Sequence, residues 1–222
     1  VDNIEPAGPV DVQSAKLDFL REQDHATAQA IGGSDAIESA VRNYETAAHM
    51  QSIVPELCDV SGESEATRKL YGTDRESKYE KFYALQCLRA RRMIEAGVRF
   101  IEITCPLTHN NNAPWDQHGE LKLRHEENAR ITDQPVAALL TDLKARGLLD
   151  ETLVLWAGEM GRTPHSSGED GRDHHVSGYT IWMAGGGIRG GMTYGATDEM
   201  GMSAVEGAVD IHDIHATVLH QL

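Results

Sequence analysis

The segment with the clearest capacity for chemistry is a run of polar residues that follows an apolar stretch. The apolar stretch, residues 152–157, has the composition of a buried strand, and Gly158 interrupts it. In open α/β sheets, ligands bind where loops leave the carboxyl ends of such strands. The alternative interpretation is a solvated loop whose carboxylates cap helices. The polar side chains that follow are those of Glu159, Arg162, Thr163, Asp173, His174 and His175.

A second candidate cluster, Asp116 and His118, lies in the loop after residues 98–104, which alternate as a strand does. Two residues apart in an extended segment, these side chains share one side and can bind one ion. A helix-capping Asp116 beside a surface His118 is the alternative. In the Asp-His-His run the two imidazoles point to opposite sides, so we assign His174 as a metal ligand. Asp173 is assigned as a ligand or as the hydrogen-bond partner of one.

Glu159 and Arg162 extend this set. The Glu159 carboxylate is a further predicted metal ligand, and the forked guanidinium of Arg162 suits an oxyanion. A surface ion pair between the two is the alternative. The sequence has no GxSxG nucleophile elbow, so the nearest candidate hydroxyl is that of Thr163, unless a metal-activated water supplies the nucleophile. Mixed oxygen and nitrogen ligands indicate one or two divalent ions, zinc or manganese rather than calcium.

The bulk composition is that of a globular protein and restricts its partners. The 222 residues are 40% hydrophobic and 25% charged. The formal net charge of −15 argues against nucleic acid as a partner, because binding phosphate backbones needs a basic surface. No apolar run approaches the roughly 18 residues of a membrane span. Cys58, Cys87 and Cys105 form neither a disulfide framework nor a metal-binding spacing.

The first half of the chain is predicted to be mostly helical. Residues 1 to about 15 are expected to be extended. A helical pattern then continues to about residue 51 and restarts after Gly33, with Ser34 or Asp35 as the N-cap. Pro135 implies a kink or a second start within a later helix. The further helices are predicted over residues 61–71, 76–96, 120–146 and 210–222.

The second half alternates expected strands with loops and helices. A glycine cluster, residues 185–191, indicates tight turns rather than a phosphate loop, since it lacks the GxxxxGK[ST] pattern. The order of elements predicts an α/β fold. We divide the chain into a mainly helical N-terminal portion, residues 1–97, and a sheet portion with the metal site, residues 98–222. The strands are expected over residues 98–104, 152–157, 179–184 and 192–194.

Several ordered motifs resemble one known family. They are WDQHG, then WAGEMGRTP, GRDHH, AGGGIRGG and YGATDE, and finally HDIHATVLH. The family consists of exported bacterial proteins that contain a domain of unknown function, and it is grouped with the alkaline-phosphatase and sulfatase superfamily. The resemblance extends from about Tyr44 to Leu222.

This resemblance implies a three-layer α/β/α sandwich around a mostly parallel sheet, as in alkaline phosphatase, and it implies export. It also implies hydrolysis of phosphate or sulfate esters at a one- or two-metal centre. Asp116 and His118 then correspond to the carboxylate and histidine of one metal, and His174 to a late histidine ligand. Glu159 stands at the strand end where the superfamily usually has Asp-His, so one expected imidazole is missing here.

The resemblance also implies a preceding half that carries a nucleophile and a metal-binding aspartate, and the chain is expected to begin after it. We therefore expect a metal-dependent hydrolase of an anionic small-molecule or glycan ester, with Arg162 binding the anion. The alternative is a binding or scaffold protein that has lost the active centre. The missing imidazole and the missing nucleophile favour that alternative.

Overall fold

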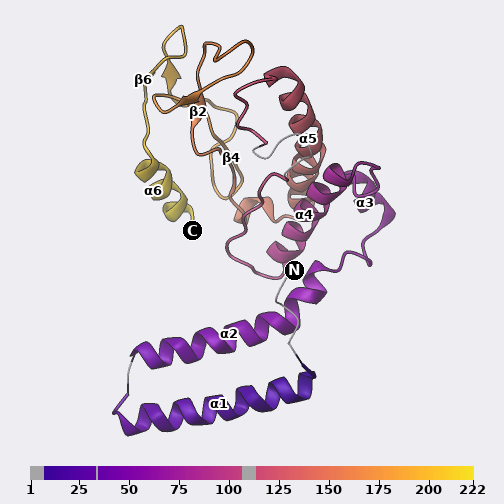
Figure 1. Cartoon of the computed structure of the whole chain (residues 1–222), viewed down its shortest axis with the longest axis vertical. Coiled ribbons are helices and arrows are strands. Elements are labelled where there is room, and N and C mark those ends of the chain that lie inside the picture. Colours follow the sequence, from indigo (N-terminus) through magenta and orange to yellow (C-terminus); the bar gives the residue numbers. More distant parts are fainter. Residues whose placement is uncertain (1–7, 34, 107–113) are drawn as a thin grey trace. The chain divides into compact units, whose positions relative to one another are not determined.

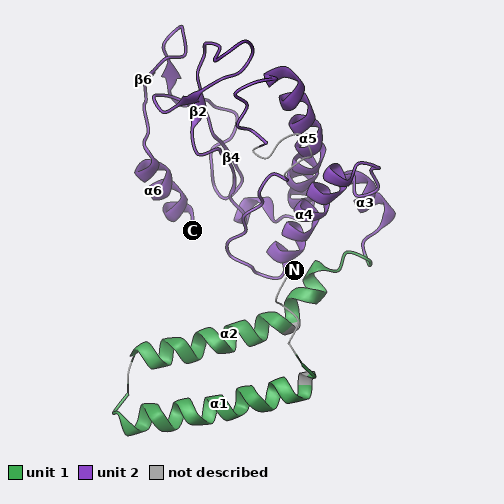
Figure 2. Ribbon diagram, viewed as in Figure 1, with its two compact units in different colours: residues 1–62 green, residues 63–222 purple. Residues whose placement is uncertain are grey.

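The computed structural model describes residues 8–33, 35–106 and 114–222. The chain divides into two compact units, one that ends at Gly62 and one that spans Glu63–Leu222 (Figure 2). Helices account for 52% of the described structure and strands for only 8%. All the described ladders are antiparallel pairs of short strands. The expected three-layer sandwich with a mostly parallel sheet is therefore wrong.

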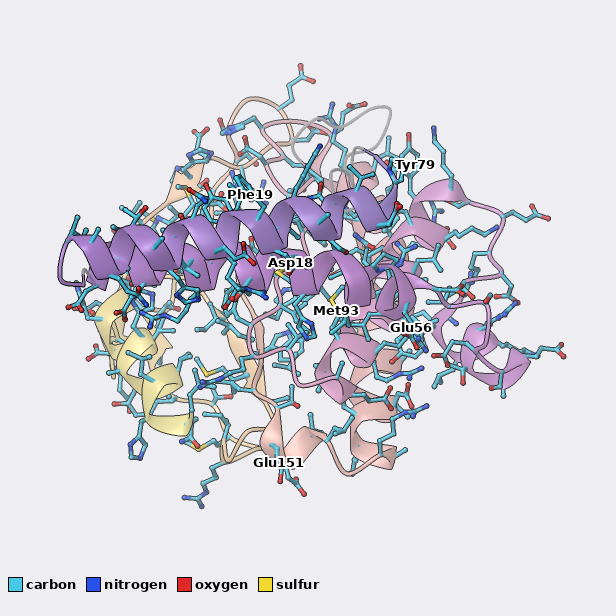
Figure 3. All side chains as sticks on the ribbon, turned by 90° about the horizontal axis from the view of Figure 1, so that it is seen from below. Asp18, Phe19, Glu56, Tyr79, Met93 and Glu151 are labelled. Carbon is cyan, nitrogen blue, oxygen red and sulfur yellow. The ribbon has the colours of Figure 1, made fainter. Side chains whose placement is uncertain are left out.

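The first unit is a helical hairpin. Helix α1 spans Val10–Ala30 and α2 spans Asp35–Cys58, and the two lie side by side in the unit (Figure 1). The extended stretch expected up to about residue 15 is wrong for residues 10–15, where α1 has already begun; Pro9 directly precedes it with a φ of −53°, which is compatible with the first helical turn. Residues 1–7 of that stretch lie outside the described residues. Ser34, one of the two expected caps, lies outside the described residues. Side chains such as those of Asp18, Phe19 and Glu56 are exposed (Figure 3).

The second unit is built on three helices. Helix α3 spans Glu65–Tyr71, α4 spans Lys78–Glu95 and α5 spans Leu121–Ala145, and all three pack together. The side-chain oxygens of Ser64 and Ser77 accept hydrogen bonds from the first turns of α3 and α4, which fixes where these helices begin. The buried apolar residues are Tyr71, Tyr83, Ala84, Cys87, Leu88, Ala90, Ile131, Ala138, Leu139 and Leu143.

Helix α5 continues through Pro135, so the expected second start near Asp133 does not occur. Proline removes one backbone hydrogen bond from a helix interior. Pro135 is buried in α5, beside the core residues Ile131 and Leu139 of the same helix. Packing of its buried face outweighs this local loss, because most helical stability in proteins comes from tertiary packing.

A buried arginine connects the three helices. The side chain of Arg91 is 3% exposed, and its guanidinium lies 2.7 Å from Glu63, 2.6 Å from Glu95 and 3.1 Å from Asp142. The hydroxyl of Tyr71 donates a 3.0 Å hydrogen bond to Asp142. Burial raises the pKa of Glu63, but hydrogen bonds from Arg91 and Arg92 outweigh it and lower that pKa. The buried charges are therefore paired, as burial requires.

The strands of the second unit form three separate antiparallel pairs. Strand β1 (Val154–Trp156) pairs with β4 (Trp182–Ala184), β2 (Gly161–Arg162) pairs with β3 (His174–His175), and β5 (Ala196–Thr197) pairs with β6 (Ala204–Glu206). The 3-10 helix η1 (Leu149–Glu151) precedes β1, and the final helix, α6 (Ile211–Gln221), begins at a capping box formed by Asp210 and Asp213.

Two expected strands are absent from the described residues. Residues 98–104 carry an alternating pattern but form no ladder, and residues 192–194 are irregular. An alternating sequence favours an extended backbone, but a strand also needs a partner with free hydrogen-bonding groups. The expected strands at 152–157 and 179–184 do form, shortened to three paired residues each, and they pair with each other.

The glycine cluster makes tight turns, as expected. Gly185, Gly186 and Gly187 all have positive φ, a conformation that other residues rarely adopt. A Cβ on Gly185 would lie 2.3 Å from the carbonyl oxygen of Leu149, so the turn also packs directly on the backbone before β1. None of the described helices has the length and apolar character needed to cross a membrane.

Arg91→Met is expected to destabilise the protein by about 3–5 kcal/mol, because the buried acids Glu63 and Asp142 then keep only their more exposed partners, Arg92 and Arg146. Arg146→Met is the matched control. Like Arg91, Arg146 contacts Glu95 on α4 and Asp142 on α5, but the Arg146 side chain is 37% exposed. We expect the control to cost no more than about 1 kcal/mol. Urea unfolding followed by circular dichroism measures the stability of both variants. Equal losses of stability would contradict the assignment of Arg91 as the arginine on which the packing of the three helices depends.

Candidate metal centre

The first ligand-bearing segment, residues 114–120, is held by buried amide side chains. Gln117 and Asn128 are both fully buried, and the amide nitrogen of each donates to the carbonyl oxygen of Pro114. Asn128 lies on α5, so this contact attaches the segment to the helical core. Gln117 points inward, and the side chains on either side of it, Asp116 and His118, remain partly exposed. His109, earlier in the same loop, lies outside the described residues.

The second ligand-bearing segment is the β2–β3 pair and the loop between its strands. The ladder places Arg162 opposite His174. Beyond the ladder, the backbone N–H of Thr163 donates to the carbonyl of Asp173 at 2.9 Å, and the N–H of Asp173 donates to the Thr163 hydroxyl at 3.0 Å. These contacts fix the backbone from which the side chains of Asp173 and His174 extend.

The two segments are joined by their backbones. The N–H of Arg172 donates to the carbonyl of Gln117 at 2.9 Å, and the N–H of Glu120 donates to the Asp170 carboxylate at 2.9 Å. Gly171 lies so close to His118 that a Cβ would be 2.0 Å from its carbonyl oxygen. Only glycine permits this approach, and it brings residues more than fifty positions apart into one site.

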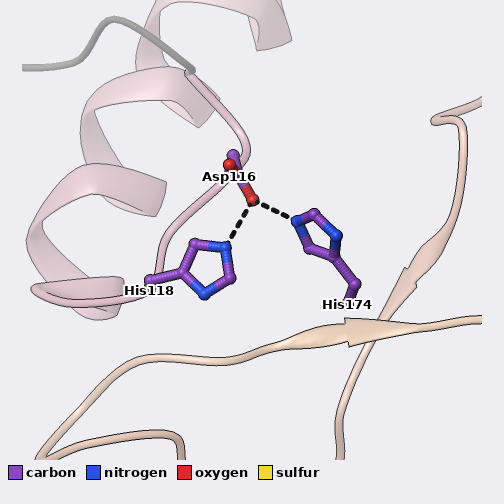
Figure 4. Close-up of side chains that lie close together, drawn as sticks. All are labelled: Asp116, His118 and His174. Atoms are coloured by element: carbon purple, nitrogen blue, oxygen red, sulfur yellow. Dashed lines mark hydrogen bonds and ion pairs between the residues drawn. The ribbon is translucent and has the colours of Figure 1, made fainter.

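The three predicted ligands Asp116, His118 and His174 meet at this junction (Figure 4). The Nε2 atoms of His118 and His174 lie 3.0 and 2.9 Å from the same oxygen, Oδ1 of Asp116. One ligand atom from each residue lies within 4.8 Å of the other two. The side chains are 36–48% exposed, so the group is open to solvent on one side.

Asp173 orients His118 from the other side of its ring. Its Oδ1 lies 3.0 Å from Nδ1 of His118, whereas Nε2 faces Asp116. An ionised carboxylate only accepts hydrogen bonds, so each contact needs a proton or a metal ion between the two atoms. A carboxylate on one ring nitrogen with a ligand position at the other is the usual arrangement around metal-binding histidines.

Both aspartates are stabilised in the ionised form. The hydrogen bond from His174 is the largest effect on the pKa of Asp116; burial opposes it, and the contact with Arg162 adds to it, so that this pKa is lowered to about 2. Hydrogen bonds from Ser167 and then from His118 lower the pKa of Asp173. The site therefore presents two carboxylates at neutral pH.

Arg162 and Glu159 adjoin the three-residue group. An Nη1 atom of Arg162 lies 2.5 Å from Oδ1 of Asp116, and its other terminal nitrogen lies 3.6 Å from the Glu159 carboxylate. The Arg162 side chain is 19% exposed and that of Glu159 is 70% exposed. The compact ligand group found among the described residues contains neither Glu159 nor Asp173.

Thr163 lies beside the centre, but its hydroxyl is already engaged. The residue is 9% exposed. Its Oγ1 donates to the carbonyl of His165 at 2.9 Å and accepts from the N–H of Asp173 at 3.0 Å. Its observed contacts close the loop between β2 and β3. The neighbouring His175 is buried on the other side of β3 from His174, as the alternation of side chains requires.

The donor set fits a single divalent ion. A tetrahedral ion with bonds of about 2.1 Å separates its ligand atoms by roughly 3.4 Å, so the observed 2.9 and 3.0 Å need a widening of only about 0.4–0.5 Å. Three protein ligands and an open side are typical of catalytic rather than structural zinc sites. Imidazole and carboxylate donors are also compatible with manganese.

Some site residues could not be identified from the sequence. No role could be assigned from the sequence to Gln117, Asn128 or Gly171, although Gln117 lies in the WDQHG motif and Gly171 in the GRDHH motif. The chain's three tryptophans also gather here: the rings of Trp115 and Trp156 meet edge to face at 6.4 Å, and those of Trp156 and Trp182 stack at 6.1 Å. They connect the residue before Asp116 to the β1–β4 pair.

Fold and site together define a mostly helical protein with a centre of two histidines and one carboxylate. A family model described as "Protein of unknown function (DUF1501)" matches residues 2–222. The chain therefore belongs to this family, which confirms the resemblance seen in the sequence at the level of the family. No curated protein and no solved structure matches the chain.

Gly171→Ala is expected to force the two ligand-bearing segments apart and to cost about 1–3 kcal/mol, as overpacking does in well-packed sites. Gly190→Ala is the control, because a Cβ there meets no atom within 4 Å and the residue does not have a positive φ. Urea unfolding and Mn²⁺ titration of both variants provide the measurement. If Gly171→Ala matches its control in both, the close approach to His118 does not shape the site.

Proposed function

We propose that the protein binds one divalent ion, zinc or manganese, at Asp116, His118 and His174, and hydrolyses phosphate or sulfate esters there. The observation that carries this proposal is the convergence of two imidazole nitrogens on one carboxylate oxygen at 3.0 and 2.9 Å, on a side open to solvent. An ion bound there would supply Lewis-acid polarisation of the ester and activation of a water molecule.

The surrounding residues provide the remaining requirements of this reaction. Asp173 holds the His118 ring so that Nε2 faces the ligand position. Arg162, whose terminal nitrogens reach the edge of the centre, would bind the oxyanion of the substrate through its fork. Because the Thr163 hydroxyl has both a donor and an acceptor contact within its loop, water is the better-supported nucleophile. The net reaction adds water to the ester and releases an alcohol and inorganic phosphate or sulfate.

The ester class comes from the resemblance to the alkaline-phosphatase and sulfatase superfamily, and that relationship stays a prediction, as does export. The substrate would be an anionic small molecule or a glycan that carries such an ester. The alternative function is metal or anion binding without catalysis. Two observations favour it. The Thr163 hydroxyl is already hydrogen-bonded within its loop, and Arg162 and Asp116 are paired with each other.

Metal binding by variant proteins tests the centre. We expect wild type to bind about one Mn²⁺ or Zn²⁺ per chain. Loss of a residue that only hydrogen-bonds a metal ligand weakens metal binding roughly 10–100-fold, so His118→Ala and His174→Ala, which remove ligands themselves, are expected to weaken it at least as much. His212→Ala on α6 is the control, because its side chain is 88% exposed and lies outside the ligand group. Calorimetric titration and elemental analysis measure binding.

Turnover separates the two functions. Chelator-treated protein, with Mn²⁺ or Zn²⁺ added back, is assayed with p-nitrophenyl phosphate, p-nitrophenyl sulfate and sulfated or phosphorylated sugars. Hydrolysis that depends on the added ion and is lost in His174→Ala, but not in His212→Ala, supports the enzyme. Stoichiometric ion binding without hydrolysis of any ester would leave only the binding function.

A further inference from the structure

In the structure, the Asp116 carboxylate is neutralised by an arginine. Oδ1 of Asp116, the oxygen that faces both histidines, also accepts a 2.5 Å hydrogen bond from Nη1 of Arg162. We propose that Arg162 is the internal counter-ion of Asp116, and that a divalent ion displaces it toward Glu159, where it becomes available to an anion. This inference rests on the metal site of the proposed function but not on its chemistry.

Arg162 and a metal ion would compete for this oxygen. An ion bound to Oδ1 would lie about 2 Å from it. With Nη1 at its present 2.5 Å from the same oxygen, the two cations would be within about 4.5 Å of each other. Like charges at that distance repel strongly, above all for a guanidinium that is only 19% exposed and weakly screened. We therefore expect ion binding to move Arg162 away from Asp116.

Glu159 is positioned to receive the displaced side chain. Its carboxylate already lies 3.6 Å from the second terminal nitrogen of Arg162, three residues along the chain. It is 70% exposed, so it can move toward the guanidinium without breaking a buried contact. Rotation about the Arg162 side chain would exchange one carboxylate for the other. The fork of the guanidinium would then face the open side of the centre, where an oxyanion enters.

The sequence favoured a different role for Glu159, as a direct metal ligand. The two roles make opposite predictions about its dependence on Arg162. A direct ligand strengthens ion binding whether or not Arg162 is charged. A carboxylate that only receives Arg162 strengthens ion binding when the arginine is present and has almost no effect once the arginine is removed. A double-mutant cycle measures this difference directly.

The experiment titrates Mn²⁺ into chelator-treated wild type, Arg162→Leu, Glu159→Gln and the double variant, by calorimetry at constant ionic strength. We expect Arg162→Leu to bind Mn²⁺ about tenfold more tightly, because the competing cation is gone. Glu159→Gln is expected to bind roughly three- to tenfold more weakly, and to change affinity by less than about twofold when added to Arg162→Leu. A structural role for either residue would instead weaken binding in every variant.

Two further substitutions keep the test independent of folding defects in a single variant. Arg162→Lys retains the charge and is expected to bind Mn²⁺ within about threefold of wild type, whereas Arg162→Gln removes the charge and should behave like Arg162→Leu. Thermal unfolding of the ion-free variants identifies any that do not fold, and the cycle is then completed with Arg162→Gln.

Inorganic sulfate tests the second half of the inference. Coupling between two ligands is reciprocal, so if ion binding frees Arg162 for an anion, sulfate must tighten Mn²⁺ binding by the same factor. We expect about a fivefold effect or more in wild type and none in Arg162→Leu. Equal effects in both proteins would show that sulfate binds elsewhere or to the ion alone, and would overturn this part.

The outcomes separate this inference from the hydrolase proposal. Unchanged or weaker binding in Arg162→Leu, or an equal loss for Glu159→Gln in both backgrounds, overturns the displacement while leaving the hydrolase to the turnover assays. The expected cycle in a protein that hydrolyses no ester supports the displacement and removes the hydrolase. Absence of Mn²⁺ and Zn²⁺ binding in wild type and in both uncharged variants overturns both.

Discussion

The larger unit of this protein depends on one buried cation. Arg91 of α4 is almost inaccessible to solvent, and its guanidinium contacts Glu63 before α3, Glu95 on α4 and Asp142 on α5. A guanidinium offers five donors in a fixed fork, so one side chain can bind several acids. Separation of any one of the three helices breaks at least one of these buried contacts, which is costly. The packing of α3, α4 and α5 is thereby cooperative.

The helical core positions the segments that form the candidate centre. Asn128 on α5 holds the Pro114 carbonyl together with Gln117, so the segment that carries Asp116 and His118 is positioned by the same helix that carries Asp142. The β2–β3 loop is then attached to that segment through Arg172 and the close approach of Gly171. A chain of backbone and buried amide contacts thus connects the core to a site whose own side chains are half exposed.

Charge balance within the centre helps to hold its side chains together in an acidic protein. The chain has a formal net charge of −15, yet each carboxylate here faces a nitrogen: Asp116 faces two imidazoles and Arg162, Asp173 faces His118, and Glu159 faces Arg162. A compact arrangement of acids alone would repel itself. The proposed exchange of Arg162 for a divalent ion would replace one positive partner of Asp116 by another.

The sequence by itself determined the helices and the chemistry of the ligands. Amphipathic spacing predicted the helices, because this signal is local. Spacing also identified Asp116, His118 and His174 as residues able to bind metal. Only the tertiary structure decided which segments pair: residues 98–104 alternate but have no ladder partner, and β1 meets β4 antiparallel rather than in a parallel sheet. It also decided that Glu159 faces Arg162 and that Asp173 faces His118 Nδ1. Partner choice depends on contacts between distant residues, such as Gly171 with His118, which no local pattern encodes.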